Sequence, residues 1–161
     1  MVTEFDKLIP ELAQWNNGAG IDASSWISCI GRYDFLLGYI SILWPAFVLY
    51  DDCVFQGLPD PKHYQGFMES LGGDKREVEK VMNHQHISDM FTVSEFPLTE
   101  DAALVIGRVL KEMWSCKLAR DFPDRAFSVE FFAEDRQDAG ASDPLLRHVI
   151  TFCQTVPQRR A

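Results

Sequence analysis

The stretch WISCIGRYDFLLGYISILWPAFVLYDDCVF, residues 26–55, decides the fold that we predict for this chain. Of its 30 residues, 21 are apolar or aromatic, and the 16 residues from Phe35 to Tyr50 carry no charge. Burying one large apolar side chain contributes roughly 1.5–3 kcal/mol, so this stretch is expected to form the centre of the core. A membrane-spanning helix needs about 20 apolar residues, and here Pro45 interrupts a shorter run. We therefore expect a buried core segment and no membrane span.

Length and composition indicate one globular domain over residues 1–161. The chain is 47% apolar and 24% charged, which is ordinary for a globular protein. It opens MVTEFDKLIPEL, which is acidic and amphipathic, whereas an export signal has a basic start followed by an apolar run. The expected location is the cytoplasm.

The formal net charge of −9 is uneven, because residues 1–60 hold eight acidic side chains against only Lys7 and Arg32. Such a charge repels polyanions and attracts basic partners. We therefore expect a possible basic protein partner and no nucleic acid. The alternative is that the charge serves solubility alone.

Helical periodicity and capping residues predict about six helices, over residues 3–16, 23–30, 35–44, 60–71, 75–91 and 99–121. The apolar stripe expected on the last of them comprises Ala102, Ile106, Val109, Leu110 and Met113. Residues 47–55 remain open between a helical turn and a buried strand, because a short apolar run fits both.

The last part of the chain changes from the helical period to an alternating one. Phe127, Val129 and Phe131 alternate with polar residues, and residues 147–155 are rich in strand-forming residues. The predicted class is α+β, a mainly helical domain with a two-stranded antiparallel ribbon at its C-terminal end.

The four cysteines predict neither disulfides nor a metal site. Cys29, Cys53, Cys116 and Cys153 form no C-x-x-C pair and have apolar neighbours, so we expect reduced, buried thiols. A zinc site normally shows paired ligands at short spacing. We expect no metal and no cofactor.

Common catalytic motifs are absent from the sequence. It contains no G-x-G-x-x-G, no G-x-x-x-x-G-K-[ST], no G-x-S-x-G and no H-E-x-x-H. Asp51 and Asp52 follow the apolar stretch and have two interpretations. They either line a pocket that holds a divalent cation or does acid–base work, with Glu69, Asp74 or His86 as partners, or they form a turn at the end of a buried element, and the turn is preferred.

His84 and His86 lie inside the helix predicted over residues 75–91. Side chains two residues apart on a helix point about 200° away from each other around its axis, so this pair is not expected to share a metal ion. Tyr and Trp supply anchors at many protein interfaces. The binding candidates are therefore Tyr33, Asp34, Trp44, Asp51, Asp52 and His86.

Five segments together resemble a family of small bacterial proteins with no assigned reaction. They are WNNGAGID (15–22), SWISCIGRYDFLLGY (25–39), WPAFVLYDDCVF (44–55), LGGDKREVEKVMNH (71–84) and GRVLKEMWSCKLARDFPDRAF (107–127). The resemblance implies a bacterial origin and supplies no catalytic residues. Small acidic bacterial proteins of this kind are similar in character to immunity proteins that neutralise toxins.

The function expected from the sequence is thus a non-enzymatic acidic module that binds a basic protein, with toxin neutralisation as one form. The alternative is a small hydrolase or ligand-binding enzyme with a carboxylate-lined pocket near Asp51 and Asp52.

Overall fold

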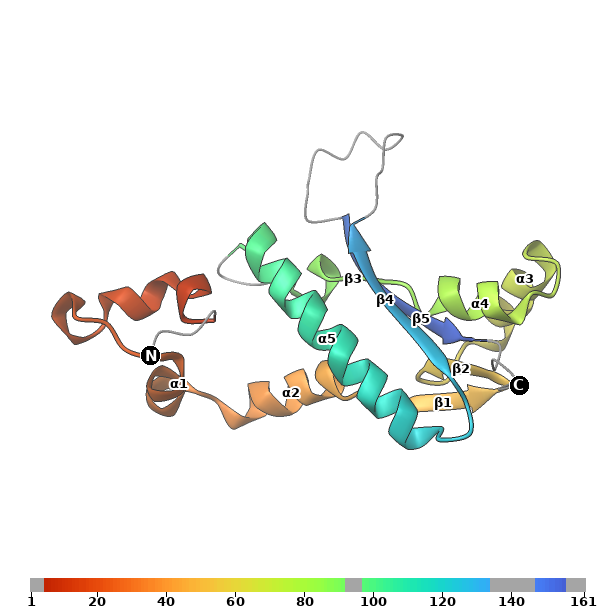
Figure 1. Cartoon of the computed structure of the whole chain (residues 1–161), viewed down its shortest axis with the longest axis horizontal. Helices are drawn as coiled ribbons and strands as arrows, with labels where there is room; N and C mark the ends of the chain where they lie inside the picture. Colours follow the sequence, from red (N-terminus) through yellow and green to blue (C-terminus); the bar gives the residue numbers. More distant parts are fainter. Residues whose placement is uncertain (1–4, 92–96, 134–146, 156–161) are drawn as a thin grey trace, which may run out of the picture. The chain divides into compact units, whose positions relative to one another are not determined.

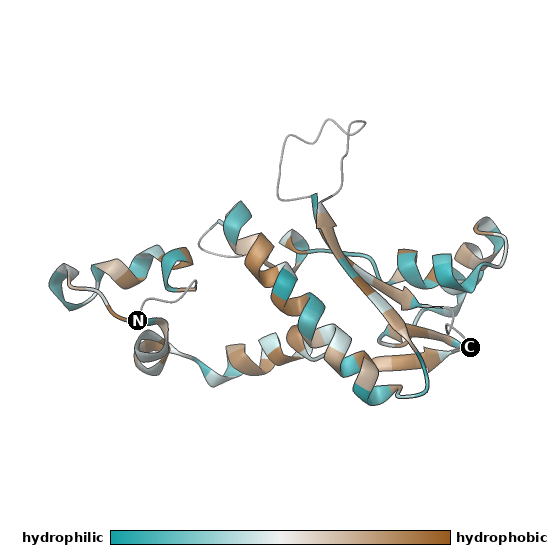
Figure 2. Cartoon of the chain, viewed as in Figure 1, coloured by the Kyte–Doolittle hydropathy of each residue, from teal (hydrophilic) through white to brown (hydrophobic). Residues whose placement is uncertain are grey.

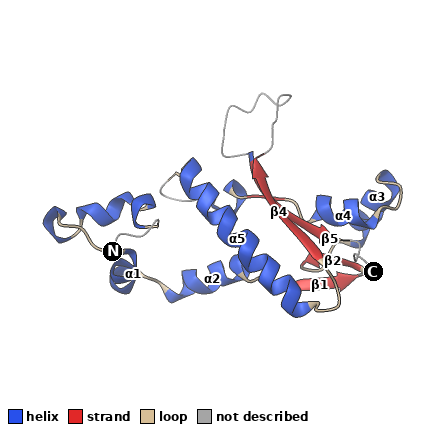
Figure 3. Cartoon of the chain, in the orientation of Figure 1, coloured by secondary structure: helices blue, strands red, loops and turns tan. Residues whose placement is uncertain are grey.

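The structure is a computed structural model that describes residues 5–91, 97–133 and 147–155 (Figure 1). Two compact units are distinguished, Met1–Tyr39 and Ile40–Ala161, and each is described by itself below. Both helices and antiparallel sheets are present, which confirms the α+β class (Figure 3). The single domain over residues 1–161 stays a prediction.

The first unit consists of short helical segments. Three 3₁₀ turns, Asp6–Leu8, Pro10–Gln14 and Asn16–Gly18, replace the single helix predicted over residues 3–16. Pro10 starts the second turn because proline has no N–H to continue the first. Helices α1 (Ala23–Ile30) and α2 (Tyr33–Leu43) follow, and the boundary between the units falls within α2.

The second unit contains two small sheets. Strands β1 (Phe47–Tyr50) and β2 (Cys53–Gln56) form an antiparallel hairpin, so the open question about residues 47–55 is resolved as strand. The other sheet has the order β3-β5-β4, with β3 at Gln85–His86, β4 at Phe127–Ala133 and β5 at His148–Gln154. The predicted C-terminal pair is therefore present as β4 and β5, and β3 extends it.

Three helices accompany these strands, and each begins at the cap residue expected from the sequence. They are α3 (Pro61–Ser70) after Asp60, α4 (Lys75–Met82) after Asp74, and α5 (Glu100–Asp121) after Thr99. The prediction that α4 continues to Phe91 is wrong. The backbone of Gln85 and His86 pairs with β5 instead, and this pairing ends the helical stretch.

Helices α5 and α4 cover the two faces of β5. Side chains alternate between the faces of a strand, and Ile150 and Phe152 join the cluster that contains Trp114 of α5. On the other face, the hydroxyl of Thr151 donates to the backbone carbonyl of Lys80 on α4, with an O···O distance of 2.6 Å. All of β5 except Gln154 is consequently buried.

The core face of α5 differs from the predicted stripe. Its buried residues are Ala103, Val105, Gly107, Leu110, Trp114 and Leu118, so Leu110 alone of the predicted set is fully buried. The packing of Phe131 explains the shift. An added Cβ on Gly107 would lie 2.1 Å from Cε2 of Phe131, so the ring occupies the place where any other residue has its side chain.

The stretch 26–55 supplies only part of the core, contrary to the prediction. Cys53, Val54 and Phe55 are at most 2% exposed, and Ile42 and Leu43 pack against the main cluster. No residue of α2 is fully buried. None of the helices in the described part of the chain is both long enough and apolar enough to cross a membrane.

Two polar side chains, one on α4 and one on the residue that caps its C-terminus, join the two sheets. The carboxylate of Glu79 accepts hydrogen bonds from the backbone N–H groups of Val54 in β2 and Gln154 in β5, at 2.6 and 2.7 Å. The side-chain amide of Asn83 donates to the carbonyl of Val54, at 2.9 Å. Both side chains are 1% exposed, and they satisfy backbone groups that would otherwise be buried without partners.

Candidate functional site

Asp51 and Asp52 form the two-residue turn of the β1–β2 hairpin. Their φ angles are 47° and 66°, and Tyr50 pairs with Cys53 on either side of them. Positive φ at both central residues gives the turn whose twist suits an antiparallel hairpin, and Asp tolerates this conformation better than most residues. The preferred interpretation of these residues as a turn therefore agrees with the structure.

The carboxylate of Asp51 is held by a phenol and an ammonium group. Tyr64 Oη donates to Asp51 Oδ2 at 2.7 Å, and Lys75 Nζ lies 3.4 Å from Oδ1 while donating to the backbone oxygen of Asp51 at 2.6 Å. The hydrogen bond from Tyr64 makes the largest contribution to lowering the pKa of Asp51, and the hydrogen bond from Lys75 makes the next largest. Burial and the contact with Asp51 raise the pKa of Tyr64.

Asp52 belongs to a second polar network that reaches β5. Arg125 donates to Asp52 Oδ1 at 2.7 Å and to Gln154 Oε1 at 2.6 Å. The side-chain amide of Gln154 then donates to the backbone oxygen of Asp52 at 2.8 Å and to Glu79 Oε1 at 2.7 Å. This network ties the hairpin turn to the end of β5.

These contacts favour a structural role for both carboxylates over acid–base chemistry. His86 lies opposite Val149 of β5, whereas Asp52 contacts Gln154. Five residues separate these positions, which is about 16 Å along a strand. Of the other proposed partners, Glu69 accepts from Gln65 of its own helix and Asp74 caps α4. Among the described residues, no group of three or more His, Cys, Asp or Glu side chains is placed to hold a metal ion.

Cys53 lies beside this turn and has the character of a buried structural thiol. Its Sγ is 3.9 Å from Tyr64 Oη, and the residue is 0% exposed. Burial raises the pKa of the thiol, which disfavours the thiolate that a nucleophile requires. The prediction that all four cysteines are buried is wrong for Cys29 and Cys116, which are exposed.

The structure places His84 and His86 differently from the sequence analysis. His86 lies in β3 and His84 directly precedes this strand, so neither belongs to α4. Their Nε2 atoms are 3.4 Å apart. Nδ1 of His86 is buried and has no hydrogen-bond partner among the described residues. The two rings therefore meet, contrary to the prediction, because these residues are not helical as expected.

Trp44 lies at the end of α2 and is half-buried. Pro45 follows it and is buried, and Lys117 Nζ of α5 lies 5.8 Å from the centroid of the indole ring. A cation in this position is attracted by the face of the ring. Trp44 therefore faces Lys117 of α5 with its ring and remains partly exposed to solvent.

The exposed apolar surface of the chain is concentrated on α1 and α2. Tyr33 is 82% exposed, and Leu36, Leu37 and Ile40 are between 44% and 62% exposed. These four residues have the spacing i, i+3, i+4 and i+7, so they form one row along the helix, the α2 row. Figure 2 shows α2 as mostly brown, in contrast to the mixed colours of α5.

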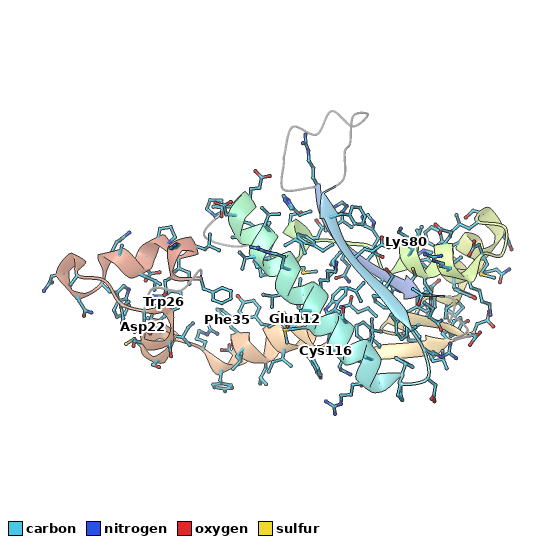
Figure 4. All side chains as sticks on the ribbon, in the orientation of Figure 1. Asp22, Trp26, Phe35, Lys80, Glu112 and Cys116 are labelled. Carbon is cyan, nitrogen blue, oxygen red and sulfur yellow. The ribbon has the colours of Figure 1, made fainter. Side chains whose placement is uncertain are left out.

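A second apolar strip lies beside the α2 row. It contains Phe35, which is labelled in Figure 4, and Tyr39 four residues later. The two side chains are 54% and 47% exposed, and the guanidinium of Arg32 lies 4.0 Å from the ring centroid of Phe35. Asp34 accepts from Arg32 at 3.1 and 2.5 Å, which lowers the pKa of Asp34. α2 is thus apolar on most of its circumference, with charge confined to its first turn.

An open cleft lies within the first unit, with a volume of about 750 Å³. Its lining includes Asp6, Leu12, Ile21, Asp22 and Ser25. The carboxylates already have partners, since Asp6 accepts from the N–H of Ala23 and Asp22 caps α1 by accepting from Ser25. Both carboxylates nevertheless add negative charge to the lining of this cleft.

The six binding candidates predicted from the sequence therefore lie in separate places. Tyr33 and Asp34 share the first turn of α2, and Asp51 and Asp52 share the hairpin turn. Trp44 and His86 belong to neither pair. The α2 row is not among the surfaces expected from the sequence. The sequence does indicate such a surface, because a helix without a polar face needs to be covered by another part of the protein or by a partner.

A comparison of the chain with protein-family models, with curated proteins and with solved structures gave no match.

Proposed function

We propose that this chain is a non-enzymatic protein-interaction module that binds a basic protein through the α2 row. The observation that carries the proposal is the amount of apolar surface left exposed on α2. A buried aromatic side chain covers roughly 150–250 Å², so the exposed fractions of Tyr33, Phe35 and Tyr39 amount to roughly 300–450 Å². The largest apolar patch of a typical monomer is about 300–600 Å² and is often functional, and these three side chains alone reach that range.

The spacing of the α2 row suits one mode of recognition. A helix that docks into a groove presents anchors at i, i+3, i+4 and i+7, and Tyr33, Leu36, Leu37 and Ile40 have this spacing. Tyrosine is also enriched among the residues that dominate binding energy. The partner expected from this pattern has an apolar groove of about two helical turns.

The charge of the chain supports a basic partner. The net charge is −9, and the first unit carries Asp6, Glu11, Asp22 and Asp34 around its helices. Opposite charges at the rim of an interface accelerate association, and this contribution falls with ionic strength. Neutralisation of a basic toxin by an immunity-type protein is one form of this function.

A photo-crosslinking experiment tests the proposal. A photoreactive amino acid at position 33, introduced in cells that naturally contain the chain, should capture a protein of basic isoelectric point. The matched control is the same amino acid at Gln65, which is exposed on α3 and outside the proposed surface. Crosslinks confined to the second unit of the same chain, or to a second copy, would contradict a partner protein.

The captured protein then allows a quantitative test by titration calorimetry. Leu36→Ser and Leu37→Ser should each weaken binding by roughly 30-fold, the effect of losing an anchor worth about 2 kcal/mol. Leu58→Ser is the matched control, because Leu58 is 76% exposed but lies outside α2. Equal losses in all three variants would show that the α2 row is not the binding surface.

A further inference from the structure

Strand β1 has an outer edge to which the described residues make no hydrogen bond. In an antiparallel pair, successive residues direct their N–H and C=O groups alternately toward the partner strand and away from it. The N–H of Gly57 donates to the carbonyl of Ala46 at 3.0 Å, which fixes the order of this alternation in the β1–β2 hairpin. Val48 therefore bonds to β2, whereas the backbone groups of Phe47 and Leu49 point away from it.

The outer edge of β2, by contrast, is closed by side chains. The N–H of Val54 donates to Glu79 at 2.6 Å, and the N–H of Gln56 donates to Asn83 at 3.1 Å. The side-chain amide of Asn83 also donates to the carbonyl of Val54, at 2.9 Å. Within the described part of the chain, β1 is therefore the edge of this sheet at which a further strand can pair.

Apart from its shortness, β1 has none of the features that protect an exposed edge from pairing. Its sequence FVLY contains no charge and no proline, and its register with β2 runs without a bulge. Leu49 is 47% exposed, although it belongs to the strand that supplies Phe47 to the core. An edge of this kind binds another extended backbone through main-chain hydrogen bonds. The occupant expected here is thus a strand.

We propose that β1 pairs antiparallel with β1 of a second copy of the chain, with the two-fold axis at Val48. In this register, Phe47 of each copy lies opposite Leu49 of the other, and the two residues exchange both of their hydrogen bonds. The outward backbone groups of both residues are then satisfied, because the strand is complementary to itself. The same pairing covers the exposed side chain of Leu49 with the neighbouring strand. This contact is independent of the α2 row.

The distribution of charge favours a second copy over a basic segment of another protein. Residues 44–50 carry no charge, so a basic segment finds no acidic side chain along the strand. Asp51 and Asp52, at the end of the strand, already contact Lys75 and Arg125. The Asp51 residues of the two copies lie at opposite ends of the paired strands, roughly 20 Å apart at about 3.3 Å per residue. This exceeds the Debye length of about 8 Å at physiological salt, so their repulsion is screened.

The closed edge of β2 limits this assembly to two copies. A two-fold contact uses the same strand of each copy, so it consumes both open edges. The joined sheet has the order β2-β1-β1-β2, and its outer strands are covered by Glu79 and Asn83. Stable interfaces bury about 1,200–2,000 Å², which is more than one short strand pair supplies. The expected dimer is therefore weak and depends on concentration.

Sedimentation velocity over a series of protein concentrations tests the proposal. The wild type should change from monomer to dimer as the concentration rises. Leu49→Pro removes the outward N–H without removing a bond to β2, and Leu49→Lys adds a charge to the edge, so each should weaken dimerisation by at least about 10-fold. Leu49→Lys decides the matter if Leu49→Pro does not fold. Leu58→Lys is the matched control, because Leu58 is 76% exposed outside β1, and it should dimerise like the wild type.

Oxidative cross-linking with diamide tests the register. The protein carries Cys29→Ser and Cys116→Ser, because these two thiols are exposed. Val48→Cys in this background should give a disulfide-linked dimer, because the two side chains at the axis face each other across the strands. Leu58→Cys is the control and should stay monomeric.

Three results would overturn the proposal. The first is a wild type that stays monomeric at every concentration, and the second is a dimer that survives both substitutions of Leu49. The third is a dimer that Val48→Cys does not cross-link, because the two-fold axis then lies elsewhere. If the wild type is monomeric and Leu49→Lys weakens the binding of a basic protein, the edge belongs to that partner and not to a second copy.

Discussion

Helices α2 and α5 differ in a way that their sequences do not suggest. α2 consists almost entirely of apolar residues, yet none of its side chains is fully buried. α5 has polar and charged residues on much of its surface, yet it buries six residues and includes Trp114 at the centre of the core. The more apolar of the two helices is thus the more exposed one.

The difference teaches that burial depends on the surface available as well as on the hydrophobicity of the helix. α5 lies on a sheet whose inward residues, such as Phe152 and Phe131, match its narrow apolar face. An amphipathic helix needs one such surface, whereas a helix that is apolar all round needs cover on every side. Within the first unit, α1 and the 3₁₀ turns are short and mostly exposed.

Truncation of one aromatic residue on each helix should give the largest contrast. Trp114→Ala removes a side chain that is 0% exposed and donates to the carbonyl of Ile42 at 2.9 Å, so it should cost about 3–5 kcal/mol. Phe35→Ala on α2 should change stability by less than about 0.5 kcal/mol. Urea unfolding of both variants measures the contrast, and equal losses would mean that Phe35 is buried in solution.

The sheet beneath α5 should depend on Glu79 of α4. Glu79→Ala leaves the backbone N–H groups of Val54 and Gln154 buried without an acceptor, so a loss of roughly 2–4 kcal/mol is expected. Glu77→Ala is the control, because Glu77 is exposed on the same helix. A Glu79→Ala protein with wild-type stability in urea would show that the two sheets hold together by apolar contacts alone.

Replacing one glycine on each helix by alanine should change the stability of the protein in opposite directions. Gly107→Ala places a methyl group 2.1 Å from a ring carbon of Phe131, and such overpacking costs about 1–3 kcal/mol. A Cβ on Gly38 of α2 meets nothing within 4 Å, so Gly38→Ala should stabilise the helix by about 0.5–1 kcal/mol. Far-UV circular dichroism during thermal unfolding measures both, and destabilisation by Gly38→Ala would mean that α2 is covered.

The smallest effect is expected from lowering the pH, which protonates Asp51 in the turn of the β1–β2 hairpin. This hairpin supplies Phe47 to the core. Asp51 has a pKa below its ordinary value of 3.8, so its carboxylate stabilises the folded state above that pH. The contribution is lost as the pH falls through the lowered pKa. Asp51→Asn should therefore be less stable than wild type near neutral pH and should approach it well below pH 3.8. A stability difference independent of pH would assign the effect to the turn geometry.

Local features of the fold could be predicted from the sequence because a few neighbouring residues determine them. Asp22, Asp60, Asp74 and Thr99 all cap the helices expected of them, and each does so by accepting a hydrogen bond from a backbone N–H two or three residues later. The turn at Asp51 and Asp52 could be predicted for the same reason, because neighbouring residues determine it. The alternation in residues 127–131 likewise predicted β4.

Features that depend on distant partners could not be predicted in the same way. The helical period continues past Met82, but β5, more than 60 residues later, pairs with Gln85 and His86 and makes them a strand. The ring of His86, in that strand, contacts the ring of His84. The core face of α5 depends on the ring of Phe131, and the exposure of α2 depends on which surfaces exist to cover it.

The contact between Gln154 and Asp52 spans 102 residues and has a consequence for synthesis. The β1–β2 hairpin leaves the ribosome early and can close its turn from local geometry. Two of the three hydrogen bonds that Glu79 accepts come from Gln154, so they form only after β5 has been made. Until then, Phe47 and Val54 of the hairpin lack Ile150 and Phe152, their partners from β5 in the core cluster, and leave apolar surface exposed. Slow translation between α4 and β5 therefore lengthens the period in which this chain is prone to aggregate.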